Sequence, residues 1–267
     1  MAQQRSFLNR PSISVVIPTL NEQRCIGSVL KDLYLQSRRP DHIIIVDGGS
    51  TDNTEAVIRI WSKFWPRVQF VEFPHRGVGA QRDFGGTYAT KMLGQATSTN
   101  ATHLLYFFDA DIHIPKHFIA STAQKMQHEH LDAACPHYQP LTEVLKNPVH
   151  VVCIQVLFAF LNGMIWFGQQ HFPAGAGSCI IVTAEHFKKI GGFTASVLVD
   201  DLDFVHRAGK TGRFKILPFS IYFSTRRFAQ YGVLRTAWQY LQIGWFFLVK
   251  RIHRTNQLQY EFGKFDK

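Results

Sequence analysis

Four segments in the first half of the chain consist almost wholly of apolar and β-branched residues. Their apolar positions run nearly without interruption instead of alternating with polar ones. Strands that are buried on both faces of a parallel sheet have this pattern. The sequence therefore predicts four buried strands, at ISVVIPT (13–19), HIIIVD (42–47), VQFVEF (68–73) and HLLYFFDA (103–110).

Between these strands, apolar residues recur at the spacing of three and four that is typical of helices. The second helical pattern follows Asp52, a residue that can cap a helix, and Glu55 lies three positions further on. The connection at 76–91 is less periodic. Strands that alternate with helices predict a doubly wound, mostly parallel α/β sheet with right-handed connections and helices on both faces. The apolar positions that predict helices are Ile26, Val29, Leu30 and Leu33, then Val57, Ile58, Trp61 and Phe64.

The second half of the chain has a different character. A polar stretch at 94–102 predicts a surface loop, whereas the run at 151–168 is almost wholly apolar. SCIIVTA (178–184) and KILPFSIYF (215–223) predict two further strands, and Gly191-Gly192 predicts a turn. A helical pattern at 233–249 precedes a basic run at 250–254. We expect one α/β domain at 12–225, with halves at 12–115 and 116–225, and a C-terminal helical segment at 226–267.

Polar motifs follow three of the predicted strands, at the carboxyl ends where ligands of such sheets bind. Asp109 and Asp111 are spaced so that both can face one pocket, and carboxylate oxygens suit Mg²⁺ or Mn²⁺. Taken alone the pair is weak, because acidic residues at strand ends are usually turn formers. Asp47 is followed by two glycines, which permit close approach of a phosphorylated ligand or simply form a tight turn.

Composition and charge narrow the possibilities. The chain has 267 residues, of which 46% are hydrophobic and only 18% charged. A large apolar surface must therefore be buried in a core or against another apolar phase such as a membrane. The net charge of +10 attracts anions such as nucleotides, diphosphates, nucleic acid or acidic lipids, and charge alone does not choose among them. The four cysteines form no CxxC pattern and the N-terminus lacks a secretory apolar core, so we expect a reducing, cytoplasmic setting.

Five motifs together resemble a family 2 glycosyltransferase of the GT-A fold. Each is common alone, and the resemblance lies in their order and spacing over most of the chain. They are VVIPTLNE (15–22), IIIVDGGSTDNT (43–54), the DxD motif DAD (109–111), GAGSCIIVTAEHFKKIGGF (175–193) and VDDLDFVHRAGKTGRF (199–214).

The resemblance implies an enzyme that takes a sugar from a nucleotide-sugar donor with inversion at the anomeric carbon. A UDP-sugar is expected more than a GDP- or dTDP-sugar, with Mn²⁺ or Mg²⁺ as cofactor and no nucleic-acid partner. By the family's motifs, Asp201 is the catalytic base, and Asp109 and Asp111 hold the metal, the ribose and the diphosphate. The donor-binding residues that the motifs imply are Pro18, Thr19, Glu22, Asp47, Gly49, Ser50, Asp109, Ala110, Asp111 and Asp200.

Two positions depart from the family's pattern. Asp200 stands where Glu is commoner, and Gly48 stands where a second Asp often follows the first, so the nucleoside contact rests on Asp47. Similar Ser-x-Arg-Arg segments occur in a subgroup of the family, and there Arg226 and Arg227 would close over the diphosphate. Alternatively, Arg226 and Arg227 form a basic turn that only solvent contacts. Because the QxxRW signature of processive synthases is absent, we expect transfer of one sugar per encounter.

Two apolar segments suggest contact with a membrane. The run at 151–168 approaches the length of a bilayer span, but Gln155 and Asn162 interrupt it, so we expect a helix in the interface or in the acceptor half. The segment at 233–249, with the basic run after it, suits a helix on an anionic leaflet or one packed in the core. We expect a peripheral protein on the cytoplasmic face, acting on a lipid or lipid-linked acceptor. The alternatives are a sugar-phosphate nucleotidyltransferase and a non-catalytic lipid- or partner-binding module.

Overall fold

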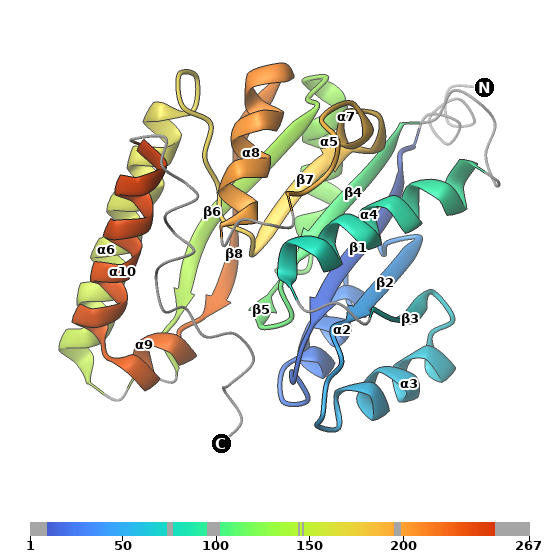
Figure 1. The fold of residues 1–267 in the computed structure, drawn as a ribbon, viewed down its shortest axis with the longest axis horizontal. Helices are drawn as coiled ribbons and strands as arrows, with labels where there is room; N and C mark the ends of the chain where they lie inside the picture. The colour runs from blue at the N-terminus through green and yellow to red at the C-terminus, as the bar shows by residue number, and fades with distance from the viewer. Residues whose placement is uncertain are drawn as a thin grey trace.

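The computed structural model describes residues 10–73, 77–94, 102–143, 145, 147–194 and 199–248. In this part of the chain one mixed sheet carries helices on both faces, and α4 is drawn in front of β1 and β2 (Figure 1). The strands are β1 Ser12–Thr19, β2 His42–Asp47, β3 Val68–Glu72, β4 His103–Phe108, β5 Ile112–His113, β6 Ala133–Leu141, β7 Cys179–Thr183 and β8 Phe214–Ser224. The helices are α2 Ile26–Tyr34, α3 Thr54–Phe64, α4 Val78–Gly94, α5 Phe118–His128, α6 Pro148–Gly168, α7 Ala184–Lys189, α8 Asp200–Thr211, α9 Arg226–Tyr231 and α10 Val233–Leu248.

The strand order in the sheet is β3-β2-β1-β4-β7-β6-β8-β5. Strands β3, β2, β1 and β4 are parallel to one another, β7 runs antiparallel to β4, and β6 is parallel to β8. This confirms the predicted strands and the mostly parallel α/β sheet. One continuous sheet runs through both predicted halves of the domain, because β5 pairs with β8. The division of the chain into those halves stays a prediction.

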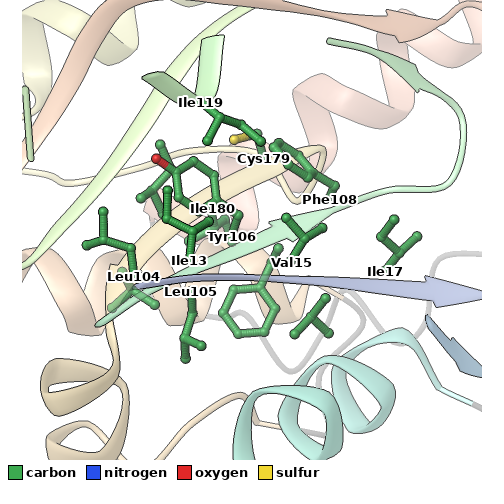
Figure 2. Close-up of a cluster of buried hydrophobic side chains, with 14 of the residues drawn as sticks. Ile13, Val15, Ile17, Leu104, Leu105, Tyr106, Phe108, Ile119, Cys179 and Ile180 are labelled. Atoms are coloured by element: carbon green, nitrogen blue, oxygen red, sulfur yellow. The ribbon is translucent and has the colours of Figure 1, made fainter. Parts of the chain in front are cut away.

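Strand β4 shows why the apolar runs are continuous. The Tyr106 hydroxyl lies 2.9 Å from the Thr122 hydroxyl of α5, and the ring of Phe108 packs on Phe118 of the same helix. Phe107, between them, packs on Phe187 of α7 and on Phe204 of α8. Alternate side chains therefore enter helical layers on opposite faces, and neither face can be polar. Figure 2 shows the buried side chains of β1 and β4 together with Ile119 of α5.

The predicted helices are present, with differences at their ends. The apolar positions of α2 are all buried, as expected, whereas in α3 Ile58 is buried and Phe64 is exposed. The predicted cap of α3 is wrong by one residue. The N-cap position is Asn53, and Asp52 instead accepts a hydrogen bond from the Thr54 backbone nitrogen at 2.9 Å.

Several elements were not predicted from the sequence. Strand β6 contains Pro136 and Pro140, residues that argue against a strand in a sheet interior. The structure accommodates Pro136 at a register shift between Cys135 and His137. Helices α5 and α9 and the two-residue strand β5 were also missed.

The segment at 151–168 lies within a helix, α6, which packs on β6 and β8 instead of being buried in a core. Helix α10 covers most of the predicted C-terminal helix and begins at Val233. The last residue of that pattern, Val249, lies outside the described residues. So do the basic run at 250–254, the C-terminal remainder to residue 267, and all but the ends of the predicted loop at 94–102.

Candidate active site

The turn after β2 is built around the buried carboxylate of Asp47. Its Oδ1 accepts hydrogen bonds from the hydroxyls of Thr19 at 3.1 Å and Ser50 at 2.6 Å. Its Oδ2 accepts from the backbone nitrogens of Gly49 at 3.0 Å and Ser50 at 2.8 Å. These four bonds use the acceptor capacity of a carboxylate. Asp47 therefore holds the turn together, and its contact to a nucleoside stays a prediction.

The backbone of that loop is open to solvent at Gly49. Gly49 has a φ of +84°, which favours glycine, and an added Cβ there would meet nothing within 4 Å. The loop after β1 lies against it, because Asn21 accepts a hydrogen bond from the Thr51 nitrogen at 2.8 Å. Pro18 and Ala110, two other predicted site residues, are buried in the framework below.

A second cluster joins residues that are far apart in the sequence. The Arg226 guanidinium at the start of α9 donates to Glu22 Oε2 at 2.9 Å and to Asp111 Oδ2 at 3.0 Å. The structure thus brings three of the predicted site residues together, Glu22, Asp111 and Arg226. The positive charge of Arg227 opposes the rise that burial causes in the pKa of Asp111.

Burial and repulsion shift the proton affinities of this cluster. Burial raises the pKa of Glu22 to about 7, with a further rise from Asp111 and Asp109 and an opposing effect of Arg226. Burial, followed by repulsion from Asp109, also raises the pKa of Asp111. The two acids of this cluster therefore bind protons more readily than exposed carboxylates do.

A third cluster centres on Arg82, a buried residue of α4. Its Nη1 donates to Asp200 Oδ2 at 2.8 Å, and its Nη2 donates to Asp109 Oδ1 at 2.6 Å and to the Gly177 carbonyl at 3.3 Å. Burial alone would lower the pKa of Arg82, but Asp200 and Asp109 raise it overall, so the guanidinium stays charged. One cation thus connects the acidic pair after β4 with the acidic cluster at the start of α8.

Asp201 lies beside this bridge. Its Oδ2 accepts from the Gly177 backbone nitrogen at 2.6 Å and its Oδ1 from the Leu202 nitrogen at 2.8 Å. Burial, followed by repulsion from Asp200, raises the pKa of Asp201 to about 6. The expected rise in pKa within the acidic cluster is present, with burial as its larger cause. Asp203 does not take part, because it pairs with Arg207 at 2.9 Å.

Sequence reasoning missed the two α4 residues that organise the site. Arg82 forms the bridge just described, and Gln81 Nε2 donates to the backbone carbonyls of Thr19 at 2.9 Å and Val46 at 2.7 Å. Gln81 thereby fixes the ends of β1 and β2, from which the predicted nucleotide loops emerge. The available signal was a polar pair, Gln81-Arg82, between the close-packed glycines 79 and 85 of a helix without an apolar period.

Residues 14–191 of the chain, two thirds of its length, match the family model "Glycosyl transferase family 2". The chain belongs to glycosyltransferase family 2. The matched segment contains Asp47, Asp109 and Asp111 and ends before Asp200 and Asp201.

Individual relatives of this family 2 protein are distant. Glycosyltransferase GlyA from Streptococcus pneumoniae serotype 4 is 23% identical over 136 residues, which are 49% of this chain and 17% of that protein. Two solved structures share the GT-A fold. The mannosyltransferase PcManGT from Pyrobaculum calidifontis, in complex with GDP-Man and Mn²⁺, has a TM-score of 0.57 at 21% identity, over 80% of this chain and 56% of that one. S. aureus TarS 1-349 in complex with UDP has a TM-score of 0.58 at 17% identity, over 85% of this chain and 64% of that one. The chain therefore spans only part of each relative's length.

The donor set of this family 2 site fits a divalent cation bound together with a substrate. No group of three or more His, Cys, Asp or Glu side chains with metal-binding geometry occurs among the described residues. Asp109 and Asp111 supply two carboxylates, and their mutual repulsion is the kind that a cation relieves. Mg²⁺ and Mn²⁺ sites commonly take one or two carboxylates and complete their shell with phosphate oxygens and water.

Proposed function

We propose that this chain is an inverting glycosyltransferase that moves a single sugar from a nucleotide-sugar donor to an acceptor hydroxyl. Family membership supports the reaction class. The observation that carries the proposal is the Arg82 bridge, 2.6 Å from Asp109 and 2.8 Å from Asp200. It brings the acidic pair assigned to the donor and the acidic cluster assigned to the acceptor into one site.

On the donor side, Asp109 and Asp111 would hold the divalent cation, and Arg226 would contact the diphosphate. When bound, such a cation stabilises the negative charge of the leaving diphosphate. The backbone of Gly49 and Ser50, held in place by Asp47 and Thr19, would contact the nucleoside. Glu22 would complete the pocket through its pair with Arg226.

On the acceptor side, Asp201 would take the proton of the attacking hydroxyl. A carboxylate with a pKa of about 6 is mostly ionised at neutral pH, yet more basic than an ordinary aspartate. The Gly177 and Leu202 nitrogens orient it. Arg82 pairs with the neighbouring Asp200 and opposes the rise that burial causes in its pKa, so Asp201 is the acid that would exchange its proton.

The proposed donor is a UDP-sugar, and the proposed acceptor is a lipid or a lipid-linked hydroxyl. S. aureus TarS has been solved with UDP and with UDP-GlcNAc, whereas PcManGT holds GDP-Man, so both nucleotide classes belong in a screen. The four described cysteines are free, which agrees with the cytoplasmic setting that we propose. A thermal-shift screen of UDP-, GDP- and dTDP-sugars with and without Mn²⁺ would identify the donor, because a bound donor raises stability by mass action.

The base is tested by Asp201→Asn. We expect the transfer rate to fall about 100- to 10,000-fold with donor affinity retained, because an amide cannot accept the proton. The wild-type rate should also decline below a pH of about 6, where Asp201 becomes protonated. Asp203→Asn is the matched control, since this acid lies on the same helix and pairs with Arg207.

The outcomes separate the possibilities. Transfer by Asp201→Asn at the wild-type rate would show that the base is wrongly assigned. Pyrophosphate release from a sugar phosphate and a nucleoside triphosphate would indicate a nucleotidyltransferase instead. Failure of every nucleotide sugar to stabilise the protein would contradict the proposal as a whole.

A further inference from the structure

Within the described part of the chain, the outer face of α6 is mostly apolar and exposed. Of the 18-residue window of this helix that is apolar enough to cross a membrane, 6% is buried. The exposed side chains recur every three or four residues, so they form one stripe along the helix. They are Val149, Val152, Val156, Phe160, Met164 and Phe167. An exposed apolar stripe of this length marks a surface that contacts another apolar phase.

The inner face of α6 is fixed to the sheet. Ile154 is fully buried, and the ring of Phe158 lies 4.5 Å from that of Phe223 on β8. Asn162 accepts a hydrogen bond from the Tyr138 nitrogen of β6 at 3.0 Å and donates to the Tyr138 carbonyl at 2.8 Å. A membrane span would have to break these contacts. The apolar phase can therefore meet the outer face only, with the helix lying along it.

The chemistry of the face matches a lipid surface. The 21 residues of α6 include no Asp, Glu, Lys or Arg, and Trp166, a residue that favours membrane interfaces, is exposed near the C-terminal end of the helix. Helix α9 packs on α6 through Phe228 and Phe158, and α10 follows it with the exposed side chains of Leu234 and Trp238. In Figure 1, α6 and α10 are drawn at the same end of the molecule.

Two occupants could cover this face, a second copy of the chain or a lipid bilayer, and the net charge of the protein favours the bilayer. The chain carries a formal charge of +10, so two copies repel each other, and the described part of α6 offers no acidic side chain to offset that repulsion. An anionic bilayer attracts the same charge. Exposed apolar side chains on a helix of a basic protein are the combination that binds anionic interfaces.

We infer that the outer face of α6 docks on the surface of an anionic lipid bilayer, with the helix lying in the interface. Helix α9, which packs on α6, begins with Arg226, the residue bound to Glu22 and Asp111. Docking would therefore bring the site close to the lipid headgroups. The inference does not depend on the proposed transferase activity, because it rests on a surface outside the site.

The test is flotation of the full chain with vesicles of phosphatidylcholine, with and without phosphatidylglycerol. We expect binding to the mixed vesicles that weakens at high salt but does not vanish, since part of it is apolar. The double variant Val156→Glu, Phe160→Glu should lower the partition coefficient about tenfold or more, because it puts charge where apolar side chains would contact the lipid. Ile60→Glu on α3 is the matched control, since Ile60 is 68% exposed and Val156 is 63% exposed.

Three results would overturn the inference: no flotation with either vesicle, equal loss of binding in the control, or a dimer that the α6 variant converts to a monomer without vesicle binding. Unfolding of each variant by urea shows whether it is folded. The stabilisation by nucleotide sugar, measured on the same variants, separates the two proposals. A variant that keeps this stabilisation and loses flotation supports docking, and failure of the donor screen leaves the flotation result unaffected.

Discussion

At the scale of single residues, the site depends on one buried guanidinium. Arg82 lies between Asp109 and Asp200 and is almost inaccessible to solvent. If Arg82 were removed, the carboxylate of Asp200 would be left with an uncompensated charge in a poorly solvated place. Arg82 is therefore a structural as well as a positioning residue.

We predict that Arg82→Gln lowers the free energy of unfolding by about 3 to 5 kcal/mol, as expected when one member of a buried ion pair is removed. Urea denaturation measures this. Arg59→Gln is the control, because Arg59 forms an exposed pair with Glu55 and should cost less than about 1 kcal/mol. Similar losses in both variants would show that the Arg82 pairs contribute nothing special.

Sequence patterns located the carboxylates of the site but could not find this arginine. Asp47 ends one buried strand and Asp109 follows another, and strand ends can be recognised in the sequence because the apolar runs stop there. Arg82 belongs to a helix without an apolar stripe, and its partner Asp200 is 118 positions away. Only the three-dimensional pairing shows that its charge is buried.

At the scale of elements, apolar residues do not recur at helical spacing along α4, because this helix packs against other elements on more than one side. An added Cβ at Gly85 would lie 2.4 Å from Val16 on β1, and one at Gly86 would lie 2.5 Å from Phe187 of α7. Glycine is required where the helix approaches the sheet so closely. Strand β6 was missed for a different reason. Its prolines argue against a strand, but the sheet accommodates Pro136 at a register shift.

We predict opposite effects of two glycine substitutions in helices. Gly85→Ala should destabilise the protein by about 1 to 3 kcal/mol through overpacking against Val16, although alanine favours a helix. Gly163→Ala on α6 should stabilise it by about 0.5 to 1 kcal/mol, because an added Cβ there meets nothing within 4 Å. Urea denaturation compares the two. Stabilisation by Gly85→Ala would contradict the close packing of α4.

At the scale of the whole molecule, Arg226 ties the end of the domain to its beginning. Its guanidinium binds Glu22, 204 positions earlier, and Asp111. The Ser224 nitrogen also donates to the Asp111 carbonyl at 3.1 Å, so the backbone after β4 and the start of α9 form one unit. A cation held by Asp111 must share this carboxylate with Arg226.

We predict that Arg226→Gln tightens Mn²⁺ binding in the absence of donor by about tenfold or more, because Glu22 and Asp111 lose their resident positive charge. The dissociation constant follows from the rise in melting temperature during a Mn²⁺ titration. Arg235→Gln on α10 serves as control, since Arg235 stacks on Tyr231. Identical titrations of all three proteins would show that Arg226 and the cation do not compete.

The position of β7 bears on how the chain is made. This strand joins β4 to β6, although it follows both of them in the sequence. On a ribosome, β4 keeps one unpaired edge until Thr183 has been synthesised, and such edges invite association with other chains. The central pairing of the sheet, and with it the fixed place of Asp109, is thus completed only after β6 and the long helix α6 have already been made.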